Sequence, residues 1–590
     1  MTQARAEFVA AALALTTALL ALGTILALPV LPGTDAPTNT MVAWVASQSV
    51  LFADYFEVSW AVTAQGFDFL TFILVAAFPL FTAAKVALAL YAVMLMASSA
   101  IIAKRAGGSP WLALALAAAF SLGWLFAMGF YNFYSGLSLG SLGIALIATP
   151  QPSWKRRLAG AAIFLTAAFG HFVAAGLLGL HSLLVRALVT PGGDRRREYA
   201  LDVLTWTPAG LLSLIPLFGL LGGGSSSPRY EVAESAMPDA LPFLLEGAFG
   251  GFCGIGWLLP IGLVLAFLVS DRDRRSVPIY AALAVVLVLL IVMPVHVAGW
   301  GFAKPRPMFL VAVAWPSLLL FRGDLGRLAP PCLAALCLLV TGTNAVGAAR
   351  EANRLESWIA NYGAVESGRT FEVNFHPEPA GATGPGVRPG IGVPHYATRL
   401  GGATPGAFAT NPIMHTTLFV GEPATLFPQT PLISMILPAE CRQDPACYRG
   451  DEFRADIIAT MVVPWDTAAL VDPPDAVIER LRGRGMTELA PWLWAPSVAD
   501  LRGDLPAGFR GPIAWQLGYL DTVGIISSGA ADIMADGMVL RVTDIPGGPT
   551  FLRVHVDPNQ DGDYQDGEEV LFQETVLLSA EEPTHVTLAR

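Results

Sequence analysis

Charged residues are scarce in this sequence, and cysteine is scarcer still. Of the 590 residues, 14% are charged and 54% are hydrophobic, and five are cysteines. The net charge is −11, and no lysine- and arginine-rich stretch offsets it, which excludes a nucleic-acid-binding protein. The sequence contains no CxxC pair or Cys/His cluster with zinc-binding spacing, and no phosphate-binding loop of the GxxxxGK[ST] type.

Long hydrophobic runs dominate the first 347 residues. The mean hydropathy of the chain is +0.57. An apolar stretch of about 20 residues is long enough to cross a bilayer, so residues 1–347 are predicted to form a polytopic membrane domain. The first run is longer than the apolar part of a signal peptide, and we expect it to be retained as a helix. The expected spans are roughly 8–30, 81–103, 109–129, 132–150, 200–221, 253–270, 278–300, 307–321 and 329–347.

The distribution of basic residues predicts how the helices cross the membrane. Lysine and arginine concentrate in cytoplasmic loops. With the N-terminus inside, the basic clusters fall inside only if residues 158–187 cross twice, as two helices meeting near His171 on the outer side. About eleven crossings result, in a bacterial inner membrane, and the C-terminal part lies outside. The clusters are Lys104/Arg105, Lys155/Arg156/Arg157, Arg195/Arg196/Arg197, Arg272/Arg274/Arg275 and Arg322/Arg327.

Residues 348–590 predict a soluble, extracytoplasmic (periplasmic) domain of α+β or β-rich fold. Glycine, proline and threonine become frequent, and short apolar runs at 416–420, 459–463, 538–543, 550–556 and 570–578 favour strands. The last of them favour a small β-sandwich, and helical pieces are expected near 350–362 and 474–485. Cys441 and Cys447 are expected to form a short disulfide loop in an oxidising compartment.

A calcium-like loop lies between two of the expected strands. The sequence DPNQDGDYQDGE at 557–568 follows the twelve-position pattern in which oxygen ligands alternate and a central glycine, Gly562, permits a sharp turn. Because its flanks favour strands, a structural Ca²⁺ loop of a β domain is expected rather than an EF-hand. The alternative is an acidic, solvated turn. The candidate ligands are Asp557, Asn559, Asp561, Asp563 and Glu568.

Polar residues at the predicted outer surface supply candidates for chemistry. The first outer loop, 31–80, carries Asp35, Asp54 and Glu57 and is expected to contain a surface-lying helix around 61–78. Lys304 and Arg306 break the positive-inside trend, and charges at a helix mouth are candidate site residues.

Three stretches of the membrane domain resemble a known family. DYFEVSW (54–60), GFYNFYSGLSLG (129–140) and FGHFVAAG (169–176), with an Asp just beyond the first helix and a cationic outer mouth, are similar to uncharacterised bacterial members of the GT-C superfamily of polytopic glycosyltransferases. The resemblance covers roughly residues 1–350. It implies inverting transfer of a sugar from a polyprenyl-phosphate-linked donor to a cell-envelope glycan or lipid.

The resemblance assigns a role to each candidate, and each role has an alternative. Asp35 would be the base that takes the acceptor proton, or else a turn residue. Asp54 and Glu57 would bind acceptor hydroxyls or a divalent ion, or solvate a helix end. Lys304 and Arg306 would bind the donor phosphate, or reach lipid headgroups. His171 would contact phosphate or sugar or serve as packing, and Asn132 would bind substrate or cap its own helix. A metal requirement and the oligomeric state stay open.

Two other classes of function remain compatible with the sequence. A lipid or polysaccharide transporter or flippase would place ionisable residues near mid-membrane with broken helices around them, and the break at His171 favours it. A non-catalytic envelope assembly protein, including a retired transferase, would use the C-terminal domain to bind a partner.

Overall fold

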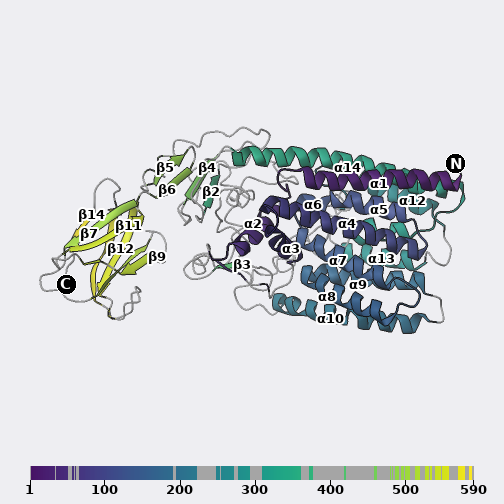
Figure 1. Cartoon of the computed structure of the whole chain (residues 1–590), viewed down its shortest axis with the longest axis horizontal. Coiled ribbons are helices and arrows are strands. Elements are labelled where there is room, and N and C mark those ends of the chain that lie inside the picture. The colour runs from purple at the N-terminus through teal and green to yellow at the C-terminus, as the bar shows by residue number, and fades with distance from the viewer. Residues whose placement is uncertain are drawn as a thin grey trace.

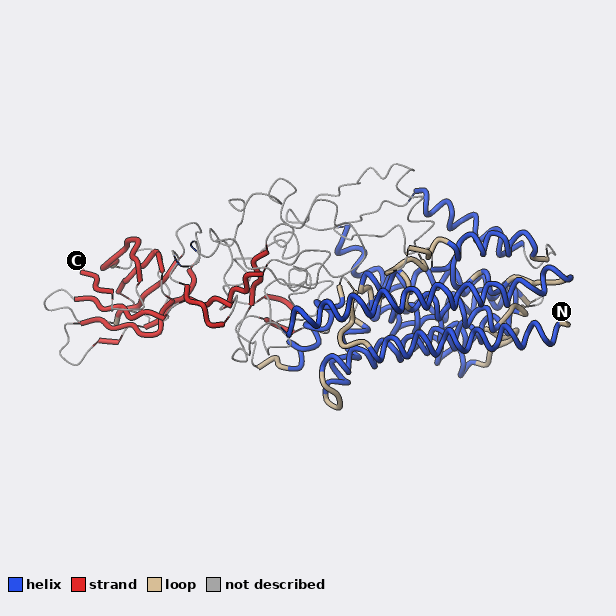
Figure 2. The backbone as a smooth tube through the Cα atoms, turned by 90° about the horizontal axis from the view of Figure 1, so that it is seen from above, coloured by secondary structure: helices blue, strands red, loops and turns tan. Residues whose placement is uncertain are grey.

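The structure, a computed structural model, has a helical part followed by a part made of strands (Figure 1; Figure 2). It describes residues 2–33, 35–50, 56–58, 60, 65–190, 194–221, 248–252, 254–271, 277–292 and 309–360, and in the C-terminal part 371–375, 417–419, 457–461, 479, 482, 486–490, 493–496, 498–504, 512–518, 525–530, 532–533, 539–546, 548–556, 558, 569–578 and 584–587.

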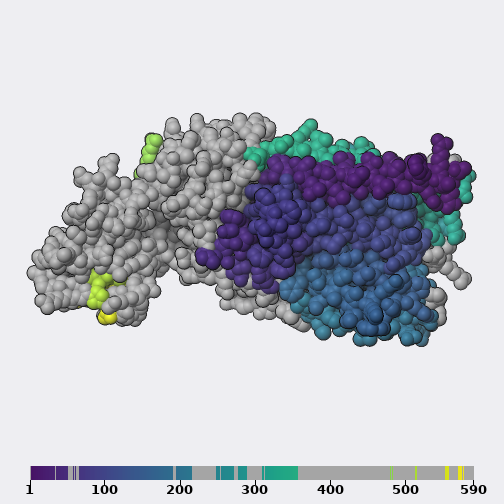
Figure 3. Space-filling view, viewed as in Figure 1, coloured from purple at the N-terminus to yellow at the C-terminus, as the bar shows by residue number. Residues whose placement is uncertain are grey.

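The helical part consists mainly of apolar helices packed side by side. Their bounds are α1 Gln3–Ala27, α2 Ala36–Ser47, α3 Gly66–Val75, α4 Leu80–Ala106, α5 Pro110–Ser121, α6 Trp124–Met128, α7 Tyr131–Ile147, α8 Trp154–Gly170, α9 Phe172–Val189, α10 Arg195–Leu221, α12 Leu258–Val269, α13 Val277–Val292 and α14 Gly323–Ala360. Helices α1 and α14 lie against each other along one edge of this part (Figure 3).

Five of these helical segments are long and apolar enough to cross a membrane. They are Gln3–Ala27, Leu80–Ala106, Pro110–Met128, Phe172–Val189 and Gly323–Glu356. The presence of several such helices is consistent with a multi-pass membrane protein. Their positions follow the hydropathy of the sequence closely.

The predicted pair of helices at 158–187 is confirmed. Helix α8 ends at Gly170, His171 adopts an extended backbone (φ −171°, ψ 111°), and α9 begins at Phe172. Gly170 and His171 both lie beside Gly136 near the start of α7, whereas Gly160 of α8 and Arg186 of α9 lie beside Ile147 at its end. The two helices are therefore antiparallel, with their turn at the end of the bundle where α7 begins.

A buried ion cluster lies at the other end of α7. The Arg186 guanidinium donates to both carboxylate oxygens of Asp202, at 2.7 and 3.0 Å, and to the carbonyl of Ile147 at 2.9 Å. Arg157 pairs with the same carboxylate at 2.6 Å and with Glu198. These two cations and two anions join α8, α9 and α10, and they satisfy carbonyls that α7 leaves unpaired at its C-terminal end.

One expectation about the helical part was wrong, and one expected span is irregular. Residues 36–47, read as loop, form helix α2, which starts with Pro37 in its first turn and buries Thr38 and Thr40. The expected span at 307–321 contains a π-helical turn, Leu310–Ala314, and a 3₁₀ turn, Pro316–Leu318. Pro316 has no N–H to continue the α-helical hydrogen bonds, so a regular span is interrupted there.

Two further expected helices are replaced or shortened. The span at 329–347 and the piece at 350–362 form one helix, α14, which continues through Pro330 and Pro331. The surface helix expected around 61–78 is present as the shorter α3, and at ten residues it is too short to span a membrane.

Strands lie at the expected positions in the C-terminal part. A first strand, β1 Phe56–Val58, belongs to the first loop. The strands of the C-terminal part are β2 Phe371–Phe375, β3 Thr417–Phe419, β4 Ile457–Met461, β5 Met486–Ala490, β6 Leu493–Pro496, β7 Val498–Asp504, β8 Ile513–Gly518, β9 Ile525–Ala530, β10 Asp532–Ile533, β11 Val539–Pro546, β12 Gly548–Val556, β13 Val570–Leu578 and β14 Thr584–Thr587. Of 474–485, only residues 479 and 482 are described, and both are helical.

The last strands form two sheets that touch. One sheet has the order β10-β11-β7-β14 and the other β13-β12-β8-β9. Strand β13 contacts both β7 and β14 of the first sheet. Leu552 and Val554 of the central strand β12 are fully buried. This arrangement agrees with the small sandwich expected from the alternating apolar runs.

One strand pair connects the helical part to the C-terminal part. Strand β1 pairs antiparallel with β3, with Phe56 opposite Phe419 and Val58 opposite Thr417. Trp60, just after β1, packs its ring against Phe69 and Phe72 of α3, with centroids 5.2 Å apart in both cases. A segment from beyond residue 400 therefore lies next to the first loop.

Candidate functional site

Polar side chains gather at the end of the bundle where α2, α3 and α7 begin and where α8 turns into α9. In Figure 1 this is the end opposite the N-terminus and facing the strands. Backbone contacts and side-chain hydrogen bonds connect these residues, which come from segments far apart in the sequence. The packing of the bundle, rather than any single motif, therefore brings them together.

Asp35 occupies the position just before α2 and is held by its backbone. Its N–H donates to the carbonyl of Met128 at 2.9 Å, and its own carbonyl accepts from the N–H of Asn39 at 3.0 Å. The residue has φ −91° and ψ −3°, outside the extended range usual for a capping residue, and its carboxylate makes no capping hydrogen bond to α2. The half-buried Asp35 carboxylate is therefore not used as the helix cap that its turn-like sequence suggests.

The turn between α6 and α7 fixes the position of Asp35. Gly129 has φ +72°, and a Cβ atom there would collide with the backbone of Asp35 and Ala36. The Asn39 amide donates to the Gly129 carbonyl at 2.9 Å, and Tyr131 lies within electrostatic range of Asp35. Asp35 is thus placed by a close contact between backbones that only glycine permits.

Asn132 caps a neighbouring helix. Its side-chain oxygen accepts from the N–H groups of Phe67, at 2.9 Å, and Asp68, at 3.3 Å, in the first turn of α3. Its amide donates to the Asp68 carboxyl at 3.0 Å. The two readings of Asn132 were a cap of its own helix or a substrate contact. The described contacts make it a cap for α3, which joins the first loop to α7.

Asp68 is a buried carboxyl that sequence reasoning missed. It lies in α3 with 5% of its surface exposed, and burial raises its pKa to about 7, while the hydrogen bond from Asn132 acts in the lowering direction. A single aspartate inside the apolar run GFDFLTFILV was the available signal.

His171 is surrounded by aromatic rings. Its imidazole meets Phe133 edge-on, with centroids 5.0 Å apart, and lies parallel to Phe172 at 5.7 Å. The backbone N–H of His171 donates to the carbonyl of Ala167 at 2.8 Å. The side chain is buried, so the described contacts are those of a packing residue at the tip of the hairpin.

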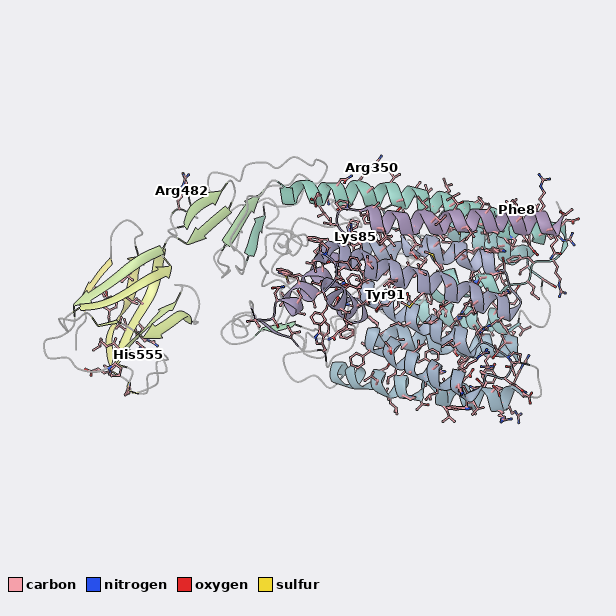
Figure 4. All side chains as sticks on the ribbon, viewed as in Figure 1. Phe8, Lys85, Tyr91, Arg350, Arg482 and His555 are labelled. Atoms are coloured by element: carbon pink, nitrogen blue, oxygen red, sulfur yellow. The ribbon has the colours of Figure 1, made fainter. Side chains whose placement is uncertain are left out.

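Lys85 and Tyr91 of α4 also belong to this end, and sequence reasoning missed both (Figure 4). The Lys85 ammonium donates to the carbonyl of Leu28 just beyond α1 at 2.7 Å. The Tyr91 hydroxyl donates to the carbonyl of Gly66 at 2.7 Å. The two side chains tie the end of α1 and the start of α3 to α4, and Lys85 adds a cation to this end of the bundle.

Several predicted site residues lie outside the described part of the chain. These are Asp54, Lys304, Arg306, the calcium-loop residues Asp557, Asn559, Asp561, Asp563 and Glu568, and the cysteines Cys441 and Cys447. Glu57 is opposite Leu418 in the β1–β3 pair. Within the described residues, no group of three or more His, Cys, Asp or Glu side chains could hold a metal ion.

Asp35, Asn132 and His171 thus come from three distant segments and lie at one end of the bundle. Comparison of the chain with protein-family models, curated proteins and solved structures finds no match. The chemistry must therefore be argued from the site itself. A half-buried carboxylate on a fixed backbone can accept a proton, and Lys85 supplies positive charge at the same end of the bundle.

Proposed function

We propose that this protein is an inverting, GT-C-like membrane glycosyltransferase of the bacterial inner membrane. It would transfer a sugar from a polyprenyl-phosphate-linked donor to a cell-envelope glycan or lipid. The observation that carries the proposal is the position of Asp35: a carboxylate at the end of an apolar bundle, held by backbone contacts to α2 and to the α6–α7 turn. A lipid-linked donor would have its chain in the bilayer and its sugar at this level.

In this proposal Asp35 takes the proton of the acceptor hydroxyl as the sugar carbon is attacked from the opposite side to the phosphate. The leaving phosphate needs positive charge rather than an acid. Lys304 and Arg306 are the proposed cations, and Lys85 lies at the same end among the described residues. Asn132 and the His171 turn would shape the site by fixing α3 and α7.

The proposed topology has eleven crossings, with the site end outside. Arg157 and Arg186 lie at the opposite end of the bundle, together with Lys104 and Arg105 at the end of α4, where the positive-inside rule expects basic residues. In this topology, the β1–β3 pair supports a C-terminal domain on the extracytoplasmic side, next to the site.

Transport receives less support from the helix geometry. A transporter would interrupt helices near mid-membrane, around its ionisable residues. At His171 the interruption instead separates two complete antiparallel helices and lies at their ends. The hairpin satisfies the charge pattern without a broken span.

The test is a profile of envelope glycans and lipids from a strain that lacks the gene, with and without a wild-type copy. Loss of one sugar on deletion, restored by the copy, is the expected result, and the product would name donor and acceptor. An unchanged set of glycans, combined with accumulation of a lipid or polysaccharide on one side of the membrane, would contradict the proposal and favour transport. An unchanged profile without accumulation would favour an assembly role.

The loop at 557–568 is proposed to bind a structural Ca²⁺ ion. It connects β12 and β13, which pair antiparallel, and the N–H of Val556 donates to the carbonyl of Glu569 at 2.8 Å to close its base. Strands therefore flank the loop, as the sequence predicts.

Calcium is expected to raise the midpoint of thermal unfolding of the full chain and to slow proteolysis within the loop, because ion binding to the folded state alone stabilises it. Asp561→Asn combined with Glu568→Gln should abolish both effects, whereas Glu574→Gln in strand β13 should leave them unchanged. A calcium effect of equal size in the double variant would rule this loop out.

A further inference from the structure

Helix α3 buries polar side chains and exposes apolar ones, the reverse of an amphipathic helix at the surface of a water-soluble protein. Its polar side chains face inward: Asp68 is 5% exposed, and Thr71, one turn later, is fully buried. Its apolar side chains Phe69 and Ile73 are 47% and 49% exposed. A helix with this pattern fits an apolar surrounding on its outer side, and it places a carboxyl group in the protein interior.

The hydrogen bonds of the Asp68 carboxyl are incomplete. One oxygen, Oδ2, accepts from the Asn132 amide at 3.0 Å. The other, Oδ1, is buried and has no hydrogen-bond partner among the described residues. No ion pair among the described residues includes Asp68. An ionised carboxylate in such a place would lose its hydration without gaining a compensating partner, whereas the neutral acid avoids this cost.

The titratable groups that the structure describes around α3 do not neutralise Asp68. Tyr91 of α4 directs its hydroxyl to the Gly66 carbonyl, and Lys85 of the same helix directs its ammonium to Leu28. On α7, the Tyr134 hydroxyl bonds to Ser121. Helix α2 contains no charged residue. The other titratable groups that the structure describes at this end include Asp35 before α2, Tyr131 of α7 and His171 after α8.

We propose that Asp68 is a proton-binding site buried between α3 and α7, and that its proton resides on Oδ1 while Oδ2 accepts from Asn132. The neutral acid permits α3 to dock with its polar face inward. Release of the proton places an uncompensated charge in this junction and weakens the docking of α3, which carries the first loop. Proton binding does not depend on sugar transfer, so either proposal can fail alone.

The pKa of Asp68 fits this role, because burial raises it from 3.8 to about 7. The folded protein then holds a proton that the unfolded chain releases. The stabilising contribution is complete below pH 3.8 and is lost as the pH rises through about 7. Across this window the equilibrium constant for unfolding should rise up to tenfold per pH unit.

Infrared spectroscopy of the full chain in phospholipid nanodiscs tests the site directly. Spectra of the wild type minus those of Asp68→Asn should contain the carbonyl band of a protonated carboxylic acid at pH 6, and most of this band should be lost by pH 8. Thermal unfolding provides a second readout: the wild-type midpoint should fall between pH 5 and pH 8, and that of Asp68→Asn should stay level.

A second variant leaves Asp68 in place. Asn132→Ala removes the hydrogen bond that lowers the pKa, so the acid band should persist to a higher pH than in the wild type. Asp324→Asn removes a carboxylate whose side chain is 99% exposed and should leave the band unchanged. If no acid band is present at pH 6 in the wild type, or if Asn132→Ala leaves its titration midpoint in place, the proposal is overturned.

Discussion

Asp35→Asn is expected to lower the rate of sugar transfer by about 10²- to 10⁴-fold, the usual contribution of a general base. The amide matches the carboxylate in size but cannot accept the proton of the acceptor hydroxyl. Asp35 is held by its backbone N–H and carbonyl, so the substitution should leave the fold intact. The rate is measured in membranes with the lipid-linked donor that the glycan profile identifies, at equal amounts of protein.

The split between kinetic constants distinguishes a base from a binding residue. Loss of a base lowers kcat and leaves KM for the donor nearly unchanged, because the interaction exists only in the transition state. Asp271→Asn is a matched control: this carboxylate pairs with Arg322 at the opposite end of the bundle and should keep wild-type activity. Full activity of Asp35→Asn would remove Asp35 as the base.

Asp202→Asn is expected to lower the free energy of unfolding by about 3–5 kcal/mol, because it leaves the buried Arg186 without its bidentate partner. The cluster of Arg157, Arg186, Glu198 and Asp202 is neutral as a whole, and the variant carries an uncompensated positive charge. The measurement is thermal unfolding of the purified chain in detergent, together with the amount of protein recovered from the membrane.

A double variant separates the loss of charge balance from the loss of the residue. Arg186→Met with Asp202→Leu removes one charge of each sign and keeps the Arg157–Glu198 pair, so it should recover part of the lost stability. The exposed pair Arg327–Asp324 supplies the control: Asp324→Asn should cost less than 1 kcal/mol, about the upper limit for surface ion pairs. Equal losses in Asp202→Asn and Asp324→Asn would contradict the role of the buried cluster.

Features that are determined by residues close together in the sequence could be predicted from it. Hydropathy located α4 and α7 to within a few residues, and strands β12 and β13 followed from short apolar runs. The hairpin at His171 required one added constraint, that basic loops share a side. The hairpin could be predicted because its turn is local in the chain: a glycine and a histidine separate two apolar runs.

The sequence was insufficient wherever a partner distant in the chain decides the structure. Helix α2 has a polar start that reads as turn, and it forms because Asn39 and the Asp35 backbone dock on the α6–α7 turn. Asn132 caps α3, a helix more than sixty positions earlier. Nothing within a short window around Asp68 indicates that its carboxyl faces α7. Such residues become visible only after the helices are packed.

The pairing of β1 with β3 sets an order of events during synthesis. Residues 56–58 leave the ribosome early, yet their partner strand begins at Thr417, after the last helix. The first loop therefore remains incomplete while every helix of the bundle is inserted, and closing so long a loop is entropically costly. A chain that stops between α14 and β3 would keep the bundle but lack this pair. The end of the molecule that carries Asp35 is thus finished last, only after nearly the whole membrane part has been built.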